Sequence, residues 1–328
     1  MTVILSDKDV RSVGDTPTVI GALERGLRAE AAGPGAVLPE RLNLGLDLRM
    51  FRIMPAMLPA AGVLGLKCFF GTLSEGVRYV VMVADLSSGE VLGIVDAAYL
   101  TALRTGAVSG IATRYLARPE SRTVGLIGSG LEAETNLAAV CAVLPIDMVR
   151  VYSRNEQRCR EFATRMCARL GVEIAPVADP RGAVGAADVV VVATNTGRDG
   201  DVAYRGEWLS DGQHVVSIGS TAPFLRELDP VSFLRPDVVV FDADPGQVGR
   251  ESGDVMALLA DNPRWSPTGV LSDVLTGNLT RTSPEQITLF KSVGTAAQDL
   301  LSARAVQQIA AERGIGIVVP DIAEPKAF

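Results

Sequence analysis

The sequence predicts an α/β fold built on a parallel sheet with helices on both faces. From residue 123 onward, short apolar strands alternate with amphipathic helices, which is the order of βαβ units. Residues 189–193 read VVVVA and residues 238–241 read VVVF. Strands that are apolar at every position are typical of a sheet covered on both faces. The chain of 328 residues is long enough for about two domains, so a second domain accompanies this sheet.

The first third of the chain has a different order of helix, strands and helix. Apolar residues recur at helical spacing over residues 18–32, and the pattern ends before Gly33-Pro34. β-rich runs at 77–85 and 90–95 are joined by a Ser-Ser-Gly turn, which predicts a hairpin. A helix is expected at 101–117, and it is rich in the small residues Ala102, Gly106, Ala107, Ser109, Gly110 and Ala112. A helix with such a face can lie very close to another backbone.

A polar, Pro-containing segment at residues 118–121 separates this region from the alternating one. The elements expected after it are a strand at 123–127, a helix at 131–144, a strand at 148–152, a helix at 155–170, a strand at 172–176, a helix at 180–186 and strands at 189–193, 214–218 and 237–241. Glu251-Ser252-Gly253-Asp254 is expected to form a helix-capping loop. A long helix at 295–313 and a β-like run at 315–319 follow.

Composition and charge exclude several classes of function. There are 31 Lys and Arg against 38 Asp and Glu, a net charge of −7, and no basic run that could follow a phosphate backbone. We therefore expect no nucleic-acid partner. His214 is the single histidine, which excludes zinc sites that need two or three imidazoles, so we expect no metal site and a structural role for His214. The four cysteines form no CxxC pair, and no segment has the length of a membrane span or the pattern of a secretory signal, which predicts a soluble cytoplasmic protein with free thiols.

A glycine-rich turn lies between the first strand and the first helix of the alternating region. It matches the pattern G-x-G-x-x-A with Gly128, Ser129, Gly130, Leu131, Glu132 and Ala133. The first Gly permits the tight turn, the second lets a pyrophosphate approach the backbone, and the small Ala lets the helix pack on the strand. Because the motif follows a strand and opens a helix, it predicts a dinucleotide site on a Rossmann-type, doubly wound sheet. The alternative is a merely structural turn.

The end of the second strand predicts which dinucleotide binds. NAD enzymes usually carry Asp or Glu there to bind the ribose 2′-hydroxyl, whereas this chain has Ser153 and Arg154, with Arg158 one turn on. A hydroxyl and a guanidinium suit a 2′-phosphate, so the sequence favours NADP(H) over NAD(H). In the alternative interpretation, Arg154 is a solvated loop residue and the cofactor is NAD(H).

Three cations of the first third lie where local preference disfavours them. Lys67 lies in an apolar β-like run, GLKCFFG, where a solvated lysine has no evident reason to be. Arg104 occupies the first turn of the small-residue helix, where the macrodipole disfavours a cation, and Arg41 follows Leu38-Pro39-Glu40. Such cations are expected if they converge on a small anion, because a guanidinium binds carboxylate oxygens as a fork. The alternative for each one separately is a surface charge or a structural ion pair.

With these residues in place, the chain resembles the ornithine cyclodeaminase/μ-crystallin family over nearly all of its length. The family's early Arg, its Met-Pro and its Lys in a Gly-Leu-Lys strand are matched by Arg41, Met54-Pro55 and Lys67. The other matches are Leu100-Thr101-Ala102-Leu103-Arg104-Thr105-Gly106-Ala107, the stretch from Gly219 to Asp229 that ends in Arg226-Glu227-Leu228-Asp229, Phe290-Lys291-Ser292-Val293-Gly294, and Gln298-Asp299. Several of these motifs are specific, and their order and spacing agree.

The resemblance implies two nested domains and a homodimer. Residues 1–119 and 296–328 would form an α+β substrate-binding and dimerisation domain, into which residues 120–295 are inserted as the Rossmann domain. The substrate would be bound by Arg41, Met54, Lys67 and Arg104. The cofactor would be held by Thr105, Gly128, Ser129, Gly130, Leu131, Glu132, Ser153, Arg154, Arg158, Thr194, Asn195, Ile218, Gly219, Ser220, Ser292 and Val293.

One departure from the family pattern decides the reaction that we expect. Cyclodeaminases carry an Asp at the position that is Thr221 here, and that carboxylate is suited to handling the side-chain amine as it cyclises. A threonine hydroxyl forms hydrogen bonds but is no general base at neutral pH, which disfavours ornithine or lysine cyclodeamination. The stretch is instead similar to that of ketimine reductases, Δ1-pyrroline-2-carboxylate reductases, iminosuccinate-type reductases and some amino-acid dehydrogenases.

The expected reaction is the NAD(P)H-dependent reduction of a 2-imino acid, preformed or made from a 2-oxo acid and an amine, to an amino acid. The three cations would clamp the carboxylate and Thr221 would position the nitrogen. Lys67 would exchange a proton with that nitrogen if guanidinium groups and burial lower its pKa. Two alternatives are an alanine-dehydrogenase-like enzyme that uses free ammonia and a non-catalytic NADPH and small-ligand binder of the crystallin type. The complete set of Arg41, Lys67 and Arg104 argues against the binder.

Overall fold

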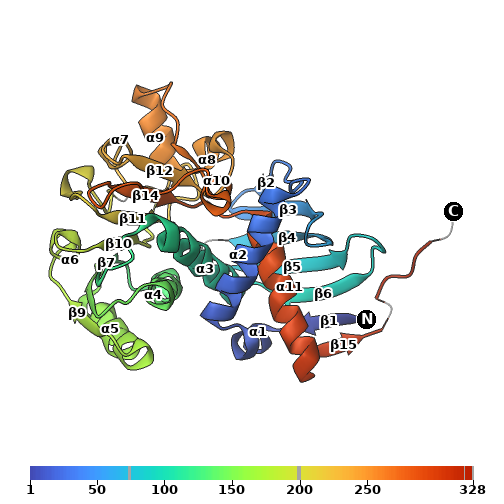
Figure 1. The fold of residues 1–328 in the computed structure, drawn as a ribbon. Coiled ribbons are helices and arrows are strands. Elements are labelled where there is room, and N and C mark those ends of the chain that lie inside the picture. The colour runs from blue at the N-terminus through green and yellow to red at the C-terminus, as the bar shows by residue number, and fades with distance from the viewer. Residues whose placement is uncertain (73–74, 198–200, 321, 327–328) are drawn as a thin grey trace. The chain divides into compact units, whose positions relative to one another are not determined.

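The chain folds into two compact units in the computed structural model, which describes residues 1–72, 75–197, 201–320 and 322–326. The first unit contains Met1–Arg104 and Thr295–Phe328, and the second contains Thr105–Gly294 (Figure 1). The second unit is therefore inserted into the sequence of the first. Its limits lie at 104/105 and 294/295, whereas the family resemblance implied 119/120 and 295/296. The first limit falls within helix α3 (Ala98–Leu116).

A seven-stranded sheet forms the centre of the first unit, in the order β15-β1-β6-β5-β4-β3-β2. The strands are β1 (Thr2–Leu5), β2 (Leu42–Leu46), β3 (Arg49–Leu58), β4 (Val63–Thr72), β5 (Gly76–Asp85), β6 (Val91–Asp96) and β15 (Ile317–Val319). Neighbouring strands run antiparallel, except that β1 and β6 are parallel. The expected hairpin at 77–85 and 90–95 is confirmed as β5 and β6.

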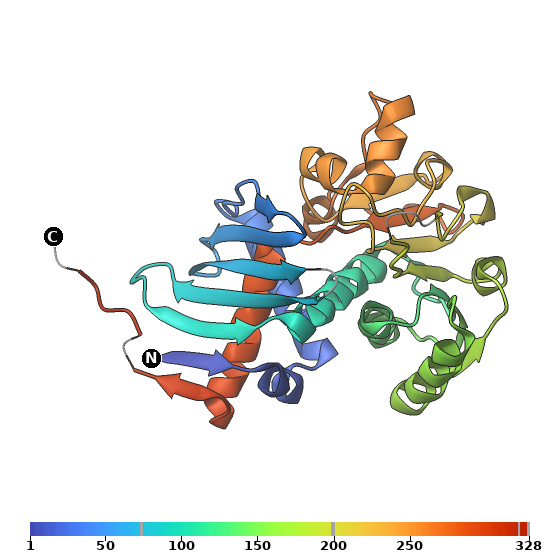
Figure 2. The same ribbon diagram turned by 180° about the vertical axis from the view of Figure 1, so that it is seen from behind.

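Helices α1 (Asp7–Val13), α2 (Thr16–Ala32) and α11 (Ala296–Arg313) belong to this unit. Helix α11 lies beside α2 and packs against β3, β4, β5 and β6 (Figure 2). Its start is set by a capping box, in which the Thr295 side chain accepts from the N–H of Gln298 and the Gln298 side chain accepts from the N–H of Thr295. This cap also sets the position of the residues in the first turn of α11.

Strand β3 was not among the strands expected from the sequence, and it contains a proline. Pro55 lies within β3, opposite Leu66 of β4. On the other side, β2 pairs with β3 only as far as Ile53, and the next pairing is the bridge between Val37 and Met57, so Pro55 lies in the gap between the two. A residue without an N–H is tolerated where the ladder needs no hydrogen bond from it.

An eight-stranded parallel sheet forms the centre of the second unit, in the order β13-β12-β14-β11-β10-β7-β8-β9. The strands are β7 (Thr123–Ile127), β8 (Met148–Tyr152), β9 (Glu173–Pro176), β10 (Val189–Val192), β11 (His214–Ser217), β12 (Val238–Phe241), β13 (Gly269–Val270) and β14 (Thr288–Lys291). The helices are α4 (Leu131–Val143), α5 (Glu156–Leu170), α6 (Pro180–Val184), α7 (Val231–Leu234), α8 (Pro245–Glu251), α9 (Gly253–Asp261) and α10 (Leu271–Thr276), with a 3-10 turn at Gly206–Trp208. The predicted α/β fold is confirmed, and each strand expected between residues 123 and 241 is displaced by at most one residue at an end.

Strands β13 and β14 were not expected from the sequence. Residues Thr288–Lys291 form only a short run that ends in a lysine, yet β14 lies between β11 and β12 and all of its residues are buried. The lysine is tolerated in the sheet because its ammonium is paired with a carboxylate, as described below.

Strand β7 marks the point where the strand order reverses. The chain passes from β7 to β8 and β9 on one side and then returns to β10 on the other side of β7. In doubly wound sheets, ligands bind at the carboxyl ends of the strands at such a point. Gly128 follows β7 there with φ at +121°, and a Cβ on Gly128 would lie 2.1 Å from the carbonyl oxygen of Ala193, which follows β10. Glycine is therefore required at this turn.

Helix α3 makes the close approach that its small residues predicted. A Cβ on Gly106 would lie 2.4 Å from the carbonyl oxygen of Thr135 in α4, so the two backbones are in direct contact there. The part of the chain that the structure describes contains no helix, α3 included, that combines the length and the apolar character needed to cross a bilayer.

Candidate active site

Lys67 lies in β4 with its side chain in the interior of the first unit, only 2% exposed. Its neighbours across the strands are Met54 in β3 and Val81 in β5, both buried. Its ammonium donates hydrogen bonds to Thr101 Oγ1 at 2.8 Å and to Asp299 Oδ1 at 2.9 Å. The lysine that stands out in an apolar run of the sequence is thus a buried cation with a specific anionic partner.

Arg104 reaches the same carboxylate from α3. Its Nε donates to Asp299 Oδ1 at 2.8 Å and its Nη1 donates to Gln298 Oε1 at 3.2 Å. Asp299 lies in the first turn of α11, where the helix dipole favours a carboxylate. The structure therefore brings Lys67 and Arg104 together through Asp299, a residue that the sequence showed only as part of a motif. A lone acid in the otherwise uncharged stretch AAQDLL was the signal that could have identified it.

The carboxylate of Asp299 is ionised although it is buried. Burial disfavours the ionised form of Asp299, but the charges and hydrogen bonds of Arg104 and Lys67 outweigh it and hold the pKa of Asp299 below its ordinary value. Asp299 Oδ2 is buried and accepts no hydrogen bond from the residues that the structure describes. Lys67 and Arg104 are both of the residue types that form charge-assisted hydrogen bonds with a ligand carboxylate.

Arg41 lies directly before β2 and is half-buried. The next residue, Leu42, is the first of β2 and lies opposite Ile53 in β3. Met54, which follows Ile53, lies opposite Lys67 in β4. The strand pairing thus places Met54 beside Lys67, and Arg41 directly precedes the strand that pairs with β3.

The glycine-rich turn of the second unit has the geometry that a pyrophosphate requires. Gly130 is the N-cap of α4, and among the described residues no side chain caps this helix. A Cβ on Gly130 would meet no described atom within 4 Å, so the backbone is open at this point. The N–H groups of Leu131 and Glu132 belong to the same first turn, where helix N–H groups and the dipole favour anions. The turn therefore fits a dinucleotide.

The side chains next to this turn join the ends of three strands. Ser129 Oγ donates to Ser153 Oγ at 2.9 Å, which connects the turns after β7 and β8. Arg154 is exposed, and its Nη2 donates to the carbonyl oxygen of Asn195, after β10, at 2.8 Å. Arg158 is exposed in the first turn of α5. A hydroxyl and two guanidinium groups therefore surround the end of β8.

The remaining residues assigned to the cofactor lie in α3 or at the carboxyl ends of β10, β11 and β14: Thr105 in α3, Thr194, then Ile218, Gly219 and Ser220, then Ser292 and Val293. Thr221 follows them after β11, is half-buried, and donates its N–H to the carbonyl oxygen of Gly219 at 3.2 Å. Asp242 accepts from the Ser292 hydroxyl at 2.6 Å and from the Val293 N–H at 2.9 Å. Parallel strands thus bring these loops to one edge of the sheet.

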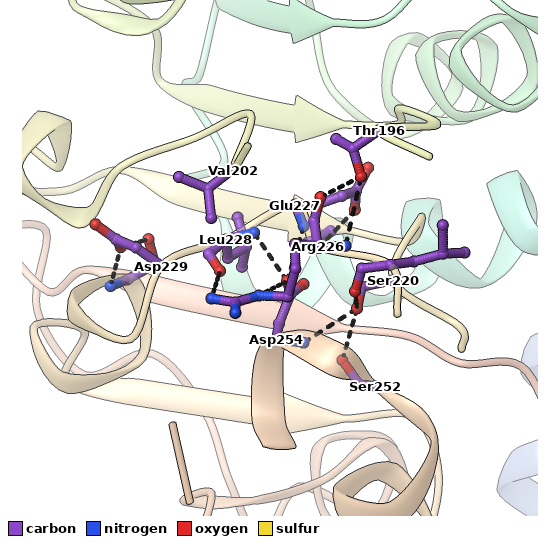
Figure 3. A network of polar contacts seen from close by, with 12 residues as sticks. Thr196, Val202, Ser220, Arg226, Glu227, Leu228, Asp229, Ser252 and Asp254 are labelled. Atoms are coloured by element: carbon purple, nitrogen blue, oxygen red, sulfur yellow. Dashed lines mark hydrogen bonds and ion pairs between the residues drawn. The ribbon is translucent and has the colours of Figure 1, made fainter. Parts of the chain in front are cut away.

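A second cluster of buried charges lies behind these loops and was not assigned from the sequence. It consists of Glu227, Asp254 and Lys291, none of which is more than 1% exposed. Burial raises the pKa of Glu227, Lys291 opposes the rise and Asp254 adds to it. Figure 3 shows the polar contacts between Asp254 and the segment that carries Glu227. As with Lys67, the signal in the sequence was a lysine in an apolar strand.

His214 lies at the amino end of β11, away from these loops. Its Nδ1 is 2.8 Å from Thr288 Oγ1. Complete burial and the nearby Arg281 lower the pKa of His214 to about 3, so the ring is neutral at physiological pH. This geometry agrees with the structural role expected for the single histidine.

Known proteins share both the sequence pattern and the fold. The profile of the ornithine cyclodeaminase/mu-crystallin family matches residues 1–314. A Δ1-pyrroline-2-carboxylate reductase of Bacillus cereus is 33% identical over 241 residues, which are 72% of this chain and 72% of that protein. The structure of Thermococcus litoralis Δ1-pyrroline-2-carboxylate reductase in complex with NADH and L-proline has a TM-score of 0.90 at 31% identity and covers 97% of this chain and 100% of that one. An archaeal alanine dehydrogenase dimer with bound NAD has a TM-score of 0.87 at 30% identity and covers 96% of this chain and 98% of that one.

Replacing Asp299 with Asn is expected to lower the free energy of unfolding, because Lys67 and Arg104 would remain buried without the counter-charge of Asp299. Breaking a buried pair in this way costs about 3–5 kcal/mol, which urea unfolding would measure. In the unmodified protein the contribution of Asp299 is fully present above its ordinary pKa, about 4, and is lost as the pH falls through its lowered pKa. Asp299→Asn should lack this acid-dependent component.

Glu156→Gln is the matched control, because it removes a carboxylate whose ion pair with Arg160 is exposed. Exposed pairs contribute little, so this variant should unfold like the unmodified protein. An Asp299→Asn variant that was as stable as the unmodified protein would contradict the role of Asp299 as the buried counter-charge of Lys67 and Arg104.

Proposed function

The chain belongs to the ornithine cyclodeaminase/mu-crystallin family, and on that premise we propose that it reduces 2-imino acids to amino acids with a nicotinamide cofactor. The substrate class comprises cyclic ketimines, such as Δ1-pyrroline-2-carboxylate, and open-chain imines of the iminosuccinate type. The proposal is carried by the convergence of Lys67 and Arg104 on Asp299. Relatives named as reductases of a cyclic imino acid, at 33% and 31% identity, support it.

The cluster supports a substrate that bears a carboxylate. Lys67 and Arg104 are buried cations that lie together at Asp299, and groups of this kind form charge-assisted hydrogen bonds with a substrate carboxylate. Arg41, directly before β2, would add a guanidinium fork, and the buried Met54 opposite Lys67 an apolar wall. Arg41, Met54, Lys67 and Arg104 are therefore the proposed substrate-binding residues.

Lys67 is the proposed proton donor to the imine nitrogen. Its Nζ is oriented by Thr101 and Asp299, and a carboxylate at 2.9 Å stabilises the ammonium, which has a proton to give. The contact between Asp299 and Lys67 was not indicated by the sequence, and the negative charge of Asp299 acts on the ammonium in the opposite direction to the positive charges of the guanidinium groups. When bound, a reduced nicotinamide supplies the hydride that adds to the imine carbon. With the proton from Lys67, the C=N bond becomes CH–NH.

Thr221 favours reduction over cyclodeamination. Its hydroxyl can form a hydrogen bond with the substrate nitrogen but is no general base at neutral pH. In the family resemblance the cyclodeaminases carry a carboxylate at this position. We therefore assign Thr221 to positioning the nitrogen that receives the proton.

The proposed cofactor is NADP(H) in preference to NAD(H). The relatives' structures named above contain NADH or NAD, which supports a nicotinamide cofactor in general. The preference for the phosphorylated form rests on Ser153, Arg154 and Arg158 at the end of β8. The pyrophosphate would lie on the N–H groups between Ser129 and Glu132. The other half of the cofactor would contact Thr105, Thr194, Asn195, Ile218, Gly219, Ser220, Ser292 and Val293.

The proposal gives the discontinuous domain, residues 1–119 with 296–328, a role in dimerisation as well as in substrate binding. Leu42, Leu44, Leu46 and Leu48 are each at least 50% exposed on and beside the edge strand β2. Leu44 lies opposite Phe51, whose ring packs edge-on against Phe70 at 6.3 Å, and both rings are partly exposed. An exposed apolar surface of this kind is typical of an interface. A second copy of the chain is the proposed occupant.

A cytoplasmic location is part of the proposal. Cys68, Cys141, Cys159 and Cys167 are free thiols. Burial raises the pKa of Cys141 to about 12, so this thiol is unreactive. Free thiols persist in a reducing compartment such as the cytoplasm.

A second candidate function is an alanine-dehydrogenase-like reaction, in which a 2-oxo acid and free ammonia form the imine. It is favoured by the 30% identity with the archaeal alanine dehydrogenase. The clamp for the carboxylate would serve both reactions equally. Only the source of the imine nitrogen distinguishes them.

A substrate panel tests the function. We expect NADPH oxidation with Δ1-pyrroline-2-carboxylate or another cyclic imine, followed at 340 nm, and weaker turnover with pyruvate and ammonia. The reverse order would favour the alanine-dehydrogenase-like reaction. No oxidation with any imine or with 2-oxo acid and amine pairs would contradict an enzyme and favour a ligand-binding protein.

Lys67→Met is expected to abolish turnover, by at least about a hundredfold, because it removes both the proton donor and part of the carboxylate clamp. NADPH binding, measured by calorimetry, should survive, since the cofactor residues lie on other elements. A Lys67→Met enzyme with normal kcat would exclude the assigned role.

Arg154→Ala is expected to raise KM for NADPH about tenfold or more, because it removes a charge-assisted contact to the 2′-phosphate, and to leave KM for NADH nearly unchanged. Arg160→Ala is the matched control, because Arg160 is exposed one turn further along α5 and pairs with Glu156. A lower KM for NADH than for NADPH in the unmodified enzyme would overturn the cofactor preference.

Leu44→Asp is expected to convert the dimer to monomers by placing a charge in the apolar surface on β2. Sedimentation equilibrium measures the change in mass. The exposed Arg169→Asp in α5 is a control that should leave the dimer intact. An unmodified protein that is monomeric at micromolar concentration would refute the dimer.

A further inference from the structure

Three motifs of the sequence each contain a charged residue that still has no role: Arg226-Glu227-Leu228-Asp229, Glu251-Ser252-Gly253-Asp254 and Phe290-Lys291-Ser292-Val293-Gly294. The second unit brings one fully buried charge from each of them together: Glu227, Asp254 and Lys291. We propose that Glu227 is a positioning residue that holds the loops after β10 and β11 in the form that accepts the nicotinamide half of the cofactor. This inference rests on the nicotinamide cofactor of the proposed function.

The carboxylate of Glu227 connects the ends of two neighbouring strands. Its Oε1 accepts hydrogen bonds from the N–H of Thr194 at 2.6 Å and from Thr194 Oγ1 at 2.9 Å. Its Oε2 accepts from the N–H of Gly219 at 2.6 Å and from Ser217 Oγ at 2.8 Å. Thr194 follows β10, whereas Ser217 and Gly219 lie at the end of β11. One side chain therefore fixes the backbone of both loops.

The contacts require an acceptor at each of the two oxygens. The N–H groups of Thr194 and Gly219 can only donate, and each points at a different oxygen of Glu227. A carboxylate meets this requirement, whereas the amide of a glutamine would turn its NH₂ group towards one of the two N–H groups. Glu227→Gln thus keeps the size of the side chain and breaks one side of the connection.

Two partners hold Glu227 in place. Asp254 Oδ1 accepts from the N–H of Glu227 at 2.7 Å and from the N–H of Leu228 at 3.1 Å, which fixes the backbone on either side (Figure 3). Lys291 donates to Asp254 Oδ2 at 3.2 Å and to Ser217 Oγ at 2.9 Å. The Ser217 hydroxyl can then donate only to Glu227. The lysine at the end of β14 thereby orients the contact between Ser217 and Glu227.

The loops also touch each other directly. A Cβ on Gly219 would lie 2.4 Å from Glu227 Oε1 and 2.4 Å from the carbonyl oxygen of Thr194. There is accordingly no room for a side chain between the loop after β10, the loop after β11 and the carboxylate. A change at Glu227 is transmitted to both loops because no softer contact separates them.

The strand order indicates which half of the cofactor these loops serve. The pyrophosphate turn follows β7, and the residues suited to the 2′-phosphate follow β8. Strands β10 and β11 lie on the other side of β7 from β8. A dinucleotide that crosses the carboxyl ends of the sheet with its adenosine half at β8 has its nicotinamide half at β10 and β11.

The test compares two ligands that differ in the nicotinamide half. Calorimetry with Glu227→Gln is expected to show Kd for NADPH raised about tenfold or more, while Kd for 2′-phospho-ADP-ribose changes by less than about twofold. Asp229→Asn is the matched control. Asp229 lies two residues beyond Glu227 and accepts from the N–H groups of Gly206 and Ser232, neither of which belongs to β10 or β11. It should leave both Kd values unchanged.

Ser217→Ala is a milder variant, which removes one hydroxyl contact to Glu227 and should raise Kd for NADPH about threefold, again without affecting the fragment. If Glu227→Gln does not fold, as judged by thermal melting, Ser217→Ala decides. An unchanged Kd for NADPH, or an equal loss for both ligands, would overturn the positioning role.

These results are separable from the proposed function. An unmodified protein that binds NADPH but reduces no imine would refute the reaction and leave the comparison of Glu227→Gln with Asp229→Asn intact. An unmodified protein that binds neither NADPH nor NADH would overturn both.

Discussion

A lysine lies in the interior of each unit because a carboxylate lies within hydrogen-bond distance of its ammonium. Asp299 pairs with Lys67 in the first unit, and Asp254 pairs with Lys291 in the second. An isolated buried charge costs several kcal/mol, so the burial of each strand is energetically coupled to the docking of the helix that carries its counter-charge. The pairs therefore connect β4 to α11 and β14 to α9, which are far apart along the chain. The need to neutralise two lysines couples the packing of each sheet to the assembly of its site.

The two clusters differ in what their charged groups contact. In the first unit, Lys67 and Arg104 share the carboxylate of Asp299, and both cations are of the kind that binds an anionic ligand. In the second unit, two carboxylates surround one lysine, and their oxygens are occupied by the N–H and O–H groups of the loops at the strand ends. One cluster is suited to binding and the other to holding backbone in place. Lysine, arginine, acidic and threonine side chains thus provide the polar chemistry of a protein with one histidine, which is buried and neutral.

Much of the fold could be predicted from local patterns. The runs of valine at β10 and β12 indicated a sheet covered on both faces, and Gly128 and Gly130 indicated the turn between β7 and α4. Strands β3 and β14 were missed, since Pro55 and Lys291 are residues that disfavour a strand unless the surroundings compensate. In β3 the compensation is the gap between the pairing with β2 and the bridge to Val37, and in β14 it is Asp254. Neither of these features can be seen within the strand's own sequence.

By itself, the sequence determined the elements whose causes are local: the helical and strand periodicities, the capping residues, the glycines at tight turns and the two cations, Lys67 and Arg104, that local preference disfavours. Only the tertiary structure decided which residues those cations pair with. Asp299 lies 232 positions from Lys67 along the chain, and Met54 lies opposite Lys67 only through the register of β3 and β4. Hydrogen bonds and ion pairs act over about 3 Å in space regardless of separation in sequence, so the partner of a buried charge is known only when the chain has folded.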